Sequence, residues 1–197
     1  DRAGATRPSL PVSTMANGYT VSGITAVGLP SVAFDNHFYF PGWGTPINTA
    51  KYFQMSVTNA NPYVLNKMTF ATESTSGTSA TMYVRSSVDN YASNIDSFTW
   101  ASPTTEVTSG DFDFDALGTL AGTTTLRFYL TSTDANSYFG FANHQCKATG
   151  GGSGCGAADA GRDITLNATV PEPGAFALLG IGMIGFAAAR RRKMAAK

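Results

Sequence analysis

Short runs in which apolar and polar residues alternate recur along the first 170 residues, and this pattern most constrains the fold. Alternation with a period of two places successive side chains on opposite faces of an extended strand. Helical spacing of apolar residues is absent upstream of residue 174. The clearest runs are 51–58, 64–71, 80–85, 123–131 and 163–170. Weaker runs are 19–21, 32–40, 98–100, 106–114 and 138–142. Together they predict roughly eight to ten strands.

The alternation also predicts which side chains face the core. These are Phe53, Met55 and Val57; Val64, Met68 and Phe70; Met82 and Val84; Leu126, Phe128 and Leu130; and Ile164, Leu166, Ala168 and Val170. The runs are bounded by turn residues, and charged residues are scarce. We therefore expect a single antiparallel β-sandwich of jelly-roll type over residues 18–170. The polar residues 1–17 are expected to be poorly ordered.

Residues 171–197 have a different, three-part pattern. Pro171, Glu172 and Pro173 form a stiff, extended strip, because each proline fixes its own φ and restricts the residue before it. The next 16 residues, 174–189, carry no charge, and the basic cluster Arg190, Arg191, Arg192 and Lys193 follows. A membrane-spanning helix needs about 20 residues, which snorkelling arginine stems can supply here. The pattern predicts a short transmembrane helix at 174–189 and a cytoplasmic tail at 190–197.

The charge distribution agrees with this topology. Residues 1–170 contain 8 basic and 12 acidic residues, whereas the segment from 171 onward contains 5 basic residues and one acid. Positive charge stays on the cytoplasmic side of a membrane, so residues 1–170 are expected outside the cytoplasm. An acidic exported part without a basic patch argues against nucleic-acid binding.

The segment from Val170 to Lys193 resembles the PEP-CTERM sorting domain, in which Pro171, Glu172 and Pro173 match the family's triplet. The resemblance implies export across the inner membrane of a Gram-negative bacterium and transient insertion in that membrane by a single span. It also implies recognition by an exosortase and cleavage near the triplet, so that the protein ends at the cell surface or outside the cell. The family is associated with exopolysaccharide and biofilms.

Export also requires an N-terminal signal peptide, and the opening residues DRAGATRPSLPV contain no apolar segment of that kind. We therefore expect that the signal has been removed, or that the sequence begins inside a precursor.

A second resemblance concerns the predicted sandwich. The segments TMYVRSSVDNYASNI and TLRFYLTSTD are similar to a recurrent ectodomain of PEP-CTERM proteins. The matching positions are Arg85, Ser86, Ser87, Asp89, Arg127 and Tyr129. This resemblance supports the β-sandwich and implies no chemistry.

Cys146 and Cys155 are the only cysteines, and a glycine-rich loop separates them. In an oxidising, exported setting an even pair predicts a disulfide. The alternatives are redox or zinc chemistry, for which only His144 is a neighbouring ligand.

The run Asp111-Phe112-Asp113-Phe114-Asp115 has two interpretations. On a strand, all three carboxylates share one face, where they repel unless a cation such as calcium lies between them. The alternative is an edge strand with Phe112 and Phe114 inward and the charges protecting the edge.

Aromatic residues raise the question of sugar binding. Trp43, Trp100, Tyr91 and Tyr138, together with Tyr63, are candidates for a sugar-stacking platform or for anchors of the core and loops. The sequence shows no H-E-x-x-H, G-x-S-x-G or P-loop motif, and His37 and His144 lie far apart. We expect a non-enzymatic surface or matrix protein; a carbohydrate-binding module is the second hypothesis, and a polysaccharide hydrolase or lyase the third.

Overall fold

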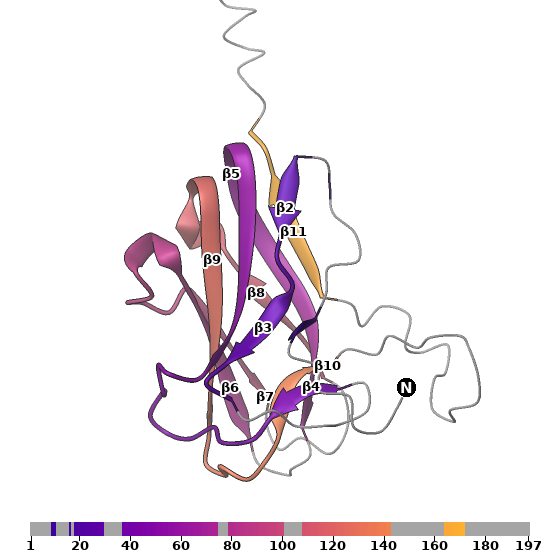
Figure 1. Cartoon of the computed structure of the whole chain (residues 1–197), viewed down its shortest axis with the longest axis vertical. Coiled ribbons are helices and arrows are strands. Elements are labelled where there is room, and N and C mark those ends of the chain that lie inside the picture. The colour runs from indigo at the N-terminus through magenta and orange to yellow at the C-terminus, as the bar shows by residue number, and fades with distance from the viewer. Residues whose placement is uncertain are drawn as a thin grey trace, which may run out of the picture.

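The computed structural model describes residues 9–10, 16, 18–29, 37–74, 79–100, 108–142 and 164–171. Within them, eleven strands are joined by antiparallel pairing into one connected sheet, and the only helical elements are two short 3-10 turns (Figure 1). The strands are β1 Ser9–Leu10, β2 Tyr19–Val21, β3 Ile24–Val27, β4 His37–Phe40, β5 Tyr52–Ser74, β6 Ala80–Ser86, β7 Asp96–Trp100, β8 Thr108–Asp113, β9 Thr119–Ser132, β10 Phe139–Ala142 and β11 Thr165–Thr169. The turns are η1 Ser87–Asp89 and η2 Asp115–Leu117. The prediction of an all-β antiparallel sandwich is confirmed at this level.

The long strand β5 connects the two layers of the sandwich. Its first half, Phe53–Asn59, pairs with β9 along one edge and with β2 and β3 along the other. Its second half, Val64–Thr72, pairs with β8 and with β11. Figure 1 shows the ribbon folding back on itself at its upper end. The register with β9 shifts between Asn59 and Tyr63, so the two runs 51–58 and 64–71 belong to one strand bent at a corner.

The remaining strands extend both layers. β6 pairs with β9, and β7 pairs with β6, which gives the order β3-β5-β9-β6-β7. β10 pairs with the end of β5 and with β4. β7 also lies next to β8, so one edge of the first layer meets the second layer there.

Phenylalanines dominate the core between the layers. The rings of Phe70 and Phe112 lie 4.7 Å apart, those of Phe112 and Phe128 5.8 Å, and those of Phe128 and Phe141 5.4 Å. The first pair is tilted, the second stacked and the third edge-on, and aromatic contacts of these kinds are favourable beyond the area that they bury. The inward positions predicted for 51–58, 80–85 and 123–131 are all buried: Phe53, Met55, Val57, Met82, Val84, Leu126, Phe128 and Leu130.

The prediction for the run 64–71 is wrong at one position. Val64 is only half-buried, and Leu65 is fully buried in its place. A bulge explains the difference, because the pairing of β5 with β11 skips Asn66 between Leu65 and Lys67. Because of this extra residue, the side chains that face inward are Leu65 before the bulge and Met68 after it. Met68 and Phe70 are buried, as predicted. In β11, Ile164, Leu166 and Ala168 pack partly against the core, whereas Val170 is exposed.

Two strands were not predicted. β3 pairs with β5, and Ser9–Leu10 pair with Thr25 and Ile24 of β3. Part of the segment 1–17 that was expected to be poorly ordered therefore joins the sheet.

Several predicted features lie outside the described residues. These are the helix at 174–189, the cluster Arg190 to Lys193, Glu172 and Pro173, Cys146 and Cys155, and His144. In the part of the chain that the structure describes, no helix has the length and apolarity to cross a membrane.

Candidate functional site

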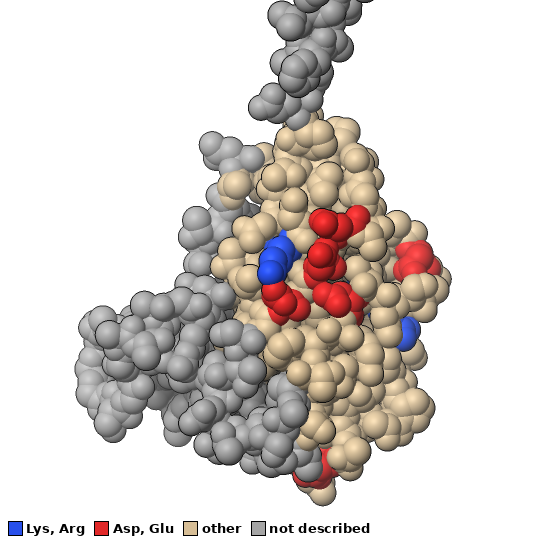
Figure 2. Space-filling view, turned by 180° about the vertical axis from the view of Figure 1, so that it is seen from behind, with Lys and Arg blue, Asp and Glu red and all other residues tan. Residues whose placement is uncertain are grey.

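The acidic run covers the end of β8, as far as Asp113, and continues into η2 at Asp115, and its first four residues show the predicted alternation. Phe112 and Phe114 are fully buried, and Asp111 and Asp113 are exposed on the opposite face. Asp111 forms an ion pair with Lys67 of β5, and its carboxylate raises the pKa of the lysine by hydrogen bonding and by charge. Figure 2 shows one basic group bordered by acidic groups on this face of the molecule.

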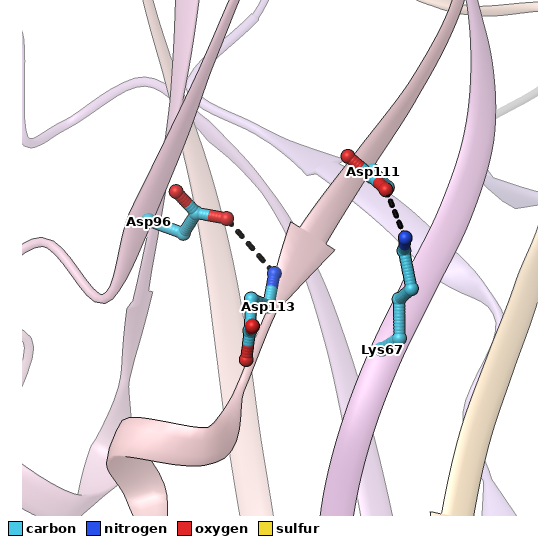
Figure 3. Close-up of polar contacts among 4 residues, drawn as sticks. All are labelled: Lys67, Asp96, Asp111 and Asp113. Atoms are coloured by element: carbon cyan, nitrogen blue, oxygen red, sulfur yellow. Dashed lines mark hydrogen bonds and ion pairs between the residues drawn. The ribbon is translucent and has the colours of Figure 1, made fainter.

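The carboxylates of this run do not converge on one point. The backbone N–H of Asp113 donates to Asp96 Oδ2 of β7 at 2.8 Å (Figure 3), and the N–H of Asp115 donates to Asp113 Oδ1 at 2.8 Å. Among the described residues, no three His, Cys, Asp or Glu side chains are arranged to hold a metal ion. The predicted calcium site at Asp111, Asp113 and Asp115 is therefore not formed there. Asp96 instead covers the edge of β8 that β5 does not pair, as an edge-protecting charge does.

The predicted sugar-stacking aromatics do not form one platform. Trp43 is 1% exposed, its ring centroid lies 5.3 Å from that of Phe53, and its Nε1 donates to the Phe139 carbonyl at 3.3 Å. A buried ring cannot meet an external sugar, so Trp43 is a core residue, as is Tyr63. Trp100 ends β7, and its side chain lies outside the description. Tyr138 is half-buried just before β10.

Tyr91 belongs to a different group of side chains, on the outer face of β5, β9 and β6. The guanidinium carbon of Arg127 lies 4.4 Å from the ring centroid of Tyr52 and 3.7 Å from that of Tyr91. The Arg85 guanidinium carbon lies 5.2 Å from the Tyr129 ring centroid. Guanidinium groups at these distances are attracted to the ring faces. We call this group the tyrosine–arginine face, which comprises Tyr52, Gln54, Tyr83, Arg85, Tyr91, Arg127 and Tyr129.

Strand register places these residues in two neighbouring rows. In one row, Tyr83 pairs with Tyr129, whose ring centroid is 5.6 Å from that of Tyr52. In the next row, Arg127 pairs with Gln54 on one side and with Arg85 on the other. All of these side chains are half-buried except Tyr129, which the neighbouring side chains cover to 2% exposure.

Hydrogen bonds fix both arginines further. Arg127 Nε donates to Gln54 Oε1 at 3.2 Å. Arg85 Nε donates to Asn94 Oδ1 at 2.7 Å, and its Nη1 donates to the Tyr91 carbonyl at 3.2 Å. Within the described ranges, neither guanidinium forms an ion pair with a carboxylate.

The turn after β6 places Tyr91 over Arg127. Asn90 and Tyr91 both have left-handed backbones, with φ of 58° and 61°. Such a conformation is strained for a bulky residue, and the surrounding bonds hold it. The N–H of Tyr91 donates to the Ser86 carbonyl at 2.8 Å, and the Asp89 carboxylate accepts from the N–H groups of Ala92 and Ser93 at 3.3 and 2.9 Å. Partial desolvation raises the pKa of Asp89, but the bonds from Ser93 and Ala92 outweigh it and lower the pKa below its usual 3.8.

The positions of the second sequence resemblance therefore meet in space. Ser86 Oγ accepts from the Val88 N–H, and Ser87 Oγ accepts from the Thr125 N–H of β9 at 3.0 Å. Their role is to shape the turn beside the two arginines. Sequence reasoning missed Tyr52, Gln54 and Asn94, because only the pairing of distant strands brings them here. Tyr52 and Gln54 could have been found as outward-facing residues of the alternating run 51–58.

The other candidate site is the point where the chain leaves the sheet. β11 pairs with β5 as far as Thr169, opposite Val64, and Thr169 Oγ1 donates to Asn66 Oδ1 at 3.3 Å. Val170 is 39% exposed and Pro171 is exposed. Residues 169–193 match the family model described as the PEP-CTERM protein-sorting motif. The chain carries a PEP-CTERM sorting motif. This motif begins on the last residue of β11, and it implies export and processing by an exosortase.

Beyond the PEP-CTERM motif, similarity to known proteins is slight. No curated protein matches the chain. Among solved structures, TmCBM61 in complex with β-1,4-galactotriose is similar over 73% of this chain and 96% of that chain, at 13% identity and a TM-score of 0.34. The galactotriose is a ligand of TmCBM61, and a likeness this low transfers nothing to this chain.

Proposed function

We propose that the sandwich is a non-enzymatic surface or extracellular-matrix module, associated with exopolysaccharide, that an exosortase releases from its C-terminal segment. The observation that carries this proposal is the position of the sorting motif. Its first residue, Thr169, is still paired in the sheet, while Pro171 is already exposed. Cleavage near the Pro-Glu-Pro triplet would therefore leave every described strand in place.

The carboxylates on and beside β8 support a structural role. Asp111 is paired with Lys67, and Asp96 accepts from the backbone of β8, so these carboxylates are used in holding and protecting the sheet. A glycosidase needs two carboxyl groups that flank a bond of the substrate in different protonation states. Hydrolysis or lyase activity of the purified protein on an exopolysaccharide would contradict this part of the proposal.

The sorting step is tested by measuring the intact mass of the protein from its native envelope. We expect a mature form that lacks the residues beyond about Pro173. Replacement of Glu172 by Ala should leave the chain uncleaved and increase the membrane-bound form severalfold. The matched control is Thr165→Ala, an exposed position on β11 next to the motif, which should be processed normally. A mature form that retains Arg190–Lys197 would contradict cleavage.

Carbohydrate binding is the second candidate function, and the tyrosine–arginine face favours it. Half-buried rings and arginines on an open sheet face offer stacking surfaces and hydrogen-bond donors together. A glycan array probed with the full chain in detergent tests this function, and failure to bind any glycan would contradict it.

A further inference from the structure

We propose that the tyrosine–arginine face binds an acidic polysaccharide, with the sugar carboxylate held by Arg85 and Arg127. This inference rests on the second candidate function and names its ligand class. The face carries two neighbouring positive charges. The two arginines are direct cross-strand partners, and like charges in that position destabilise a sheet. Among the described residues, no carboxylate forms an ion pair with either of them.

The arginines also have unused donors. A guanidinium carries five N–H groups. Arg127 uses only its Nε, and Arg85 uses its Nε and Nη1, among the described residues. Both side chains are half-buried and therefore reachable from solvent. Planar guanidinium groups bind carboxylates through paired hydrogen bonds. A bound carboxylate would therefore neutralise positive charge and accept hydrogen bonds from the unused N–H groups.

The face is rigid before a ligand arrives. Arg127 is held between the rings of Tyr52 and Tyr91, and Gln54 fixes its Nε. Tyr91 keeps its place through a strained left-handed backbone that the Asp89 carboxylate supports. Side chains that are already ordered lose little entropy on binding, which favours affinity. Strain of this kind is more often retained at functional positions than elsewhere.

The surroundings favour a glycan over an acidic peptide. Hydroxyl pairs cover the neighbouring positions of the same face: Ser56 with Thr125 at 2.9 Å, Thr58 with Thr123 at 2.8 Å and Thr81 with Thr99 at 2.8 Å. An extended peptide gains affinity by pairing its backbone with a free sheet edge. β9 is paired on both sides by β5 and β6, so it offers side chains only. The half-buried rings of Tyr52 and Tyr83, in the row beside the arginines, give a sugar ring an apolar surface next to the guanidinium donors.

The test uses the full chain in detergent and calorimetric titration with polygalacturonate oligomers. The matched ligands are the same oligomers with their carboxyl groups methyl-esterified, and poly-glutamate. We expect binding to polygalacturonate, and a loss of at least tenfold in affinity after esterification. Arg127→Gln and Arg85→Gln should each lower affinity for polygalacturonate by roughly 10- to 100-fold, as for a lost charged hydrogen bond. Lys67→Gln removes the same charge from the other layer and should change affinity less than about twofold.

Contradicting results are distinct. Equal binding of the esterified oligomers would overturn the carboxylate assignment and leave carbohydrate binding intact. Equal or tighter binding of poly-glutamate would overturn the glycan assignment. If Arg127→Gln fails to fold, Arg127→Lys keeps the charge but loses the planar fork, and it should still weaken binding about tenfold. Unchanged affinity in that variant overturns the proposal. Processing by exosortase is read separately from the mass of the mature form.

Discussion

At the scale of single residues, two neighbouring tyrosines differ in what their hydroxyl groups do. The rings of Tyr19 and Tyr63 meet edge to face with centroids 5.9 Å apart. The Tyr63 hydroxyl is hydrogen-bonded to the Val57 carbonyl at 3.1 Å and to the Thr124 hydroxyl at 2.9 Å. The Tyr19 hydroxyl is buried and has no hydrogen bond of good geometry among the described residues, so desolvation raises its pKa and the nearby Asn59 side chain only partly offsets this. The same chemical group therefore stabilises the fold at one position and costs desolvation at the other.

This difference predicts opposite effects for one substitution. Tyr63→Phe should lower the free energy of unfolding by about 1–3 kcal/mol, because it leaves a buried carbonyl and a buried hydroxyl unsatisfied. Tyr19→Phe should leave it unchanged or raise it by up to about 1 kcal/mol, since the ring contact remains and an unpaired polar atom is removed. Urea unfolding of both variants measures the difference. A larger loss for Tyr19→Phe than for Tyr63→Phe would be inconsistent with these contacts.

At the scale of elements, the turn after β6 links stability to pH. The folded-state pKa of Asp89 lies below its ordinary value, so its contribution is present above about pH 4 and is lost as pH falls through the folded pKa. Asp89→Asn should therefore cost about 1 kcal/mol near neutral pH, as for other carboxylates that cap backbone N–H groups, and progressively less as the pH falls through the folded-state pKa. Asn90→Gly, which keeps the left-handed backbone, is the control and should shift stability by a constant amount at all pH values. Thermal melts between pH 2.5 and 7 measure this, and a cost of Asp89→Asn that does not decrease as the pH falls would argue against it.

The elements also show where sequence reasoning ends. Alternation located most strands and their inward faces, because burial on one face is a local property with a period of two. It failed at Asn66, where one bulged residue reverses the phase, and it gave two separate runs, 51–58 and 64–71, where the structure has the single bent strand β5. The meeting of Arg85, Arg127 and Tyr52 depends on the register between three distant strands. No local pattern encodes that register, so the resemblance supplied the motif positions but not the face that they build.

At the scale of the whole molecule, the sorting motif and the sandwich are joined at one strand, and we propose that this limits where a cut leaves the sandwich intact. Ile164, Leu166 and Ala168 of β11 pack on the core, and β11 covers one edge of β5, whereas Val170 and Pro171 are exposed. A chain that ends at Pro173 should therefore unfold with the same free energy as the natural mature form, within about 0.5 kcal/mol. A chain that ends at Asp163 should lose about 3 kcal/mol or more, because it exposes apolar area and the unpaired edge of β5. Urea unfolding of the two truncated chains measures the difference. Equal stability of the two would mean that β11 belongs to the removable segment rather than to the sandwich, and the position of the exosortase cut would then no longer be limited by the fold.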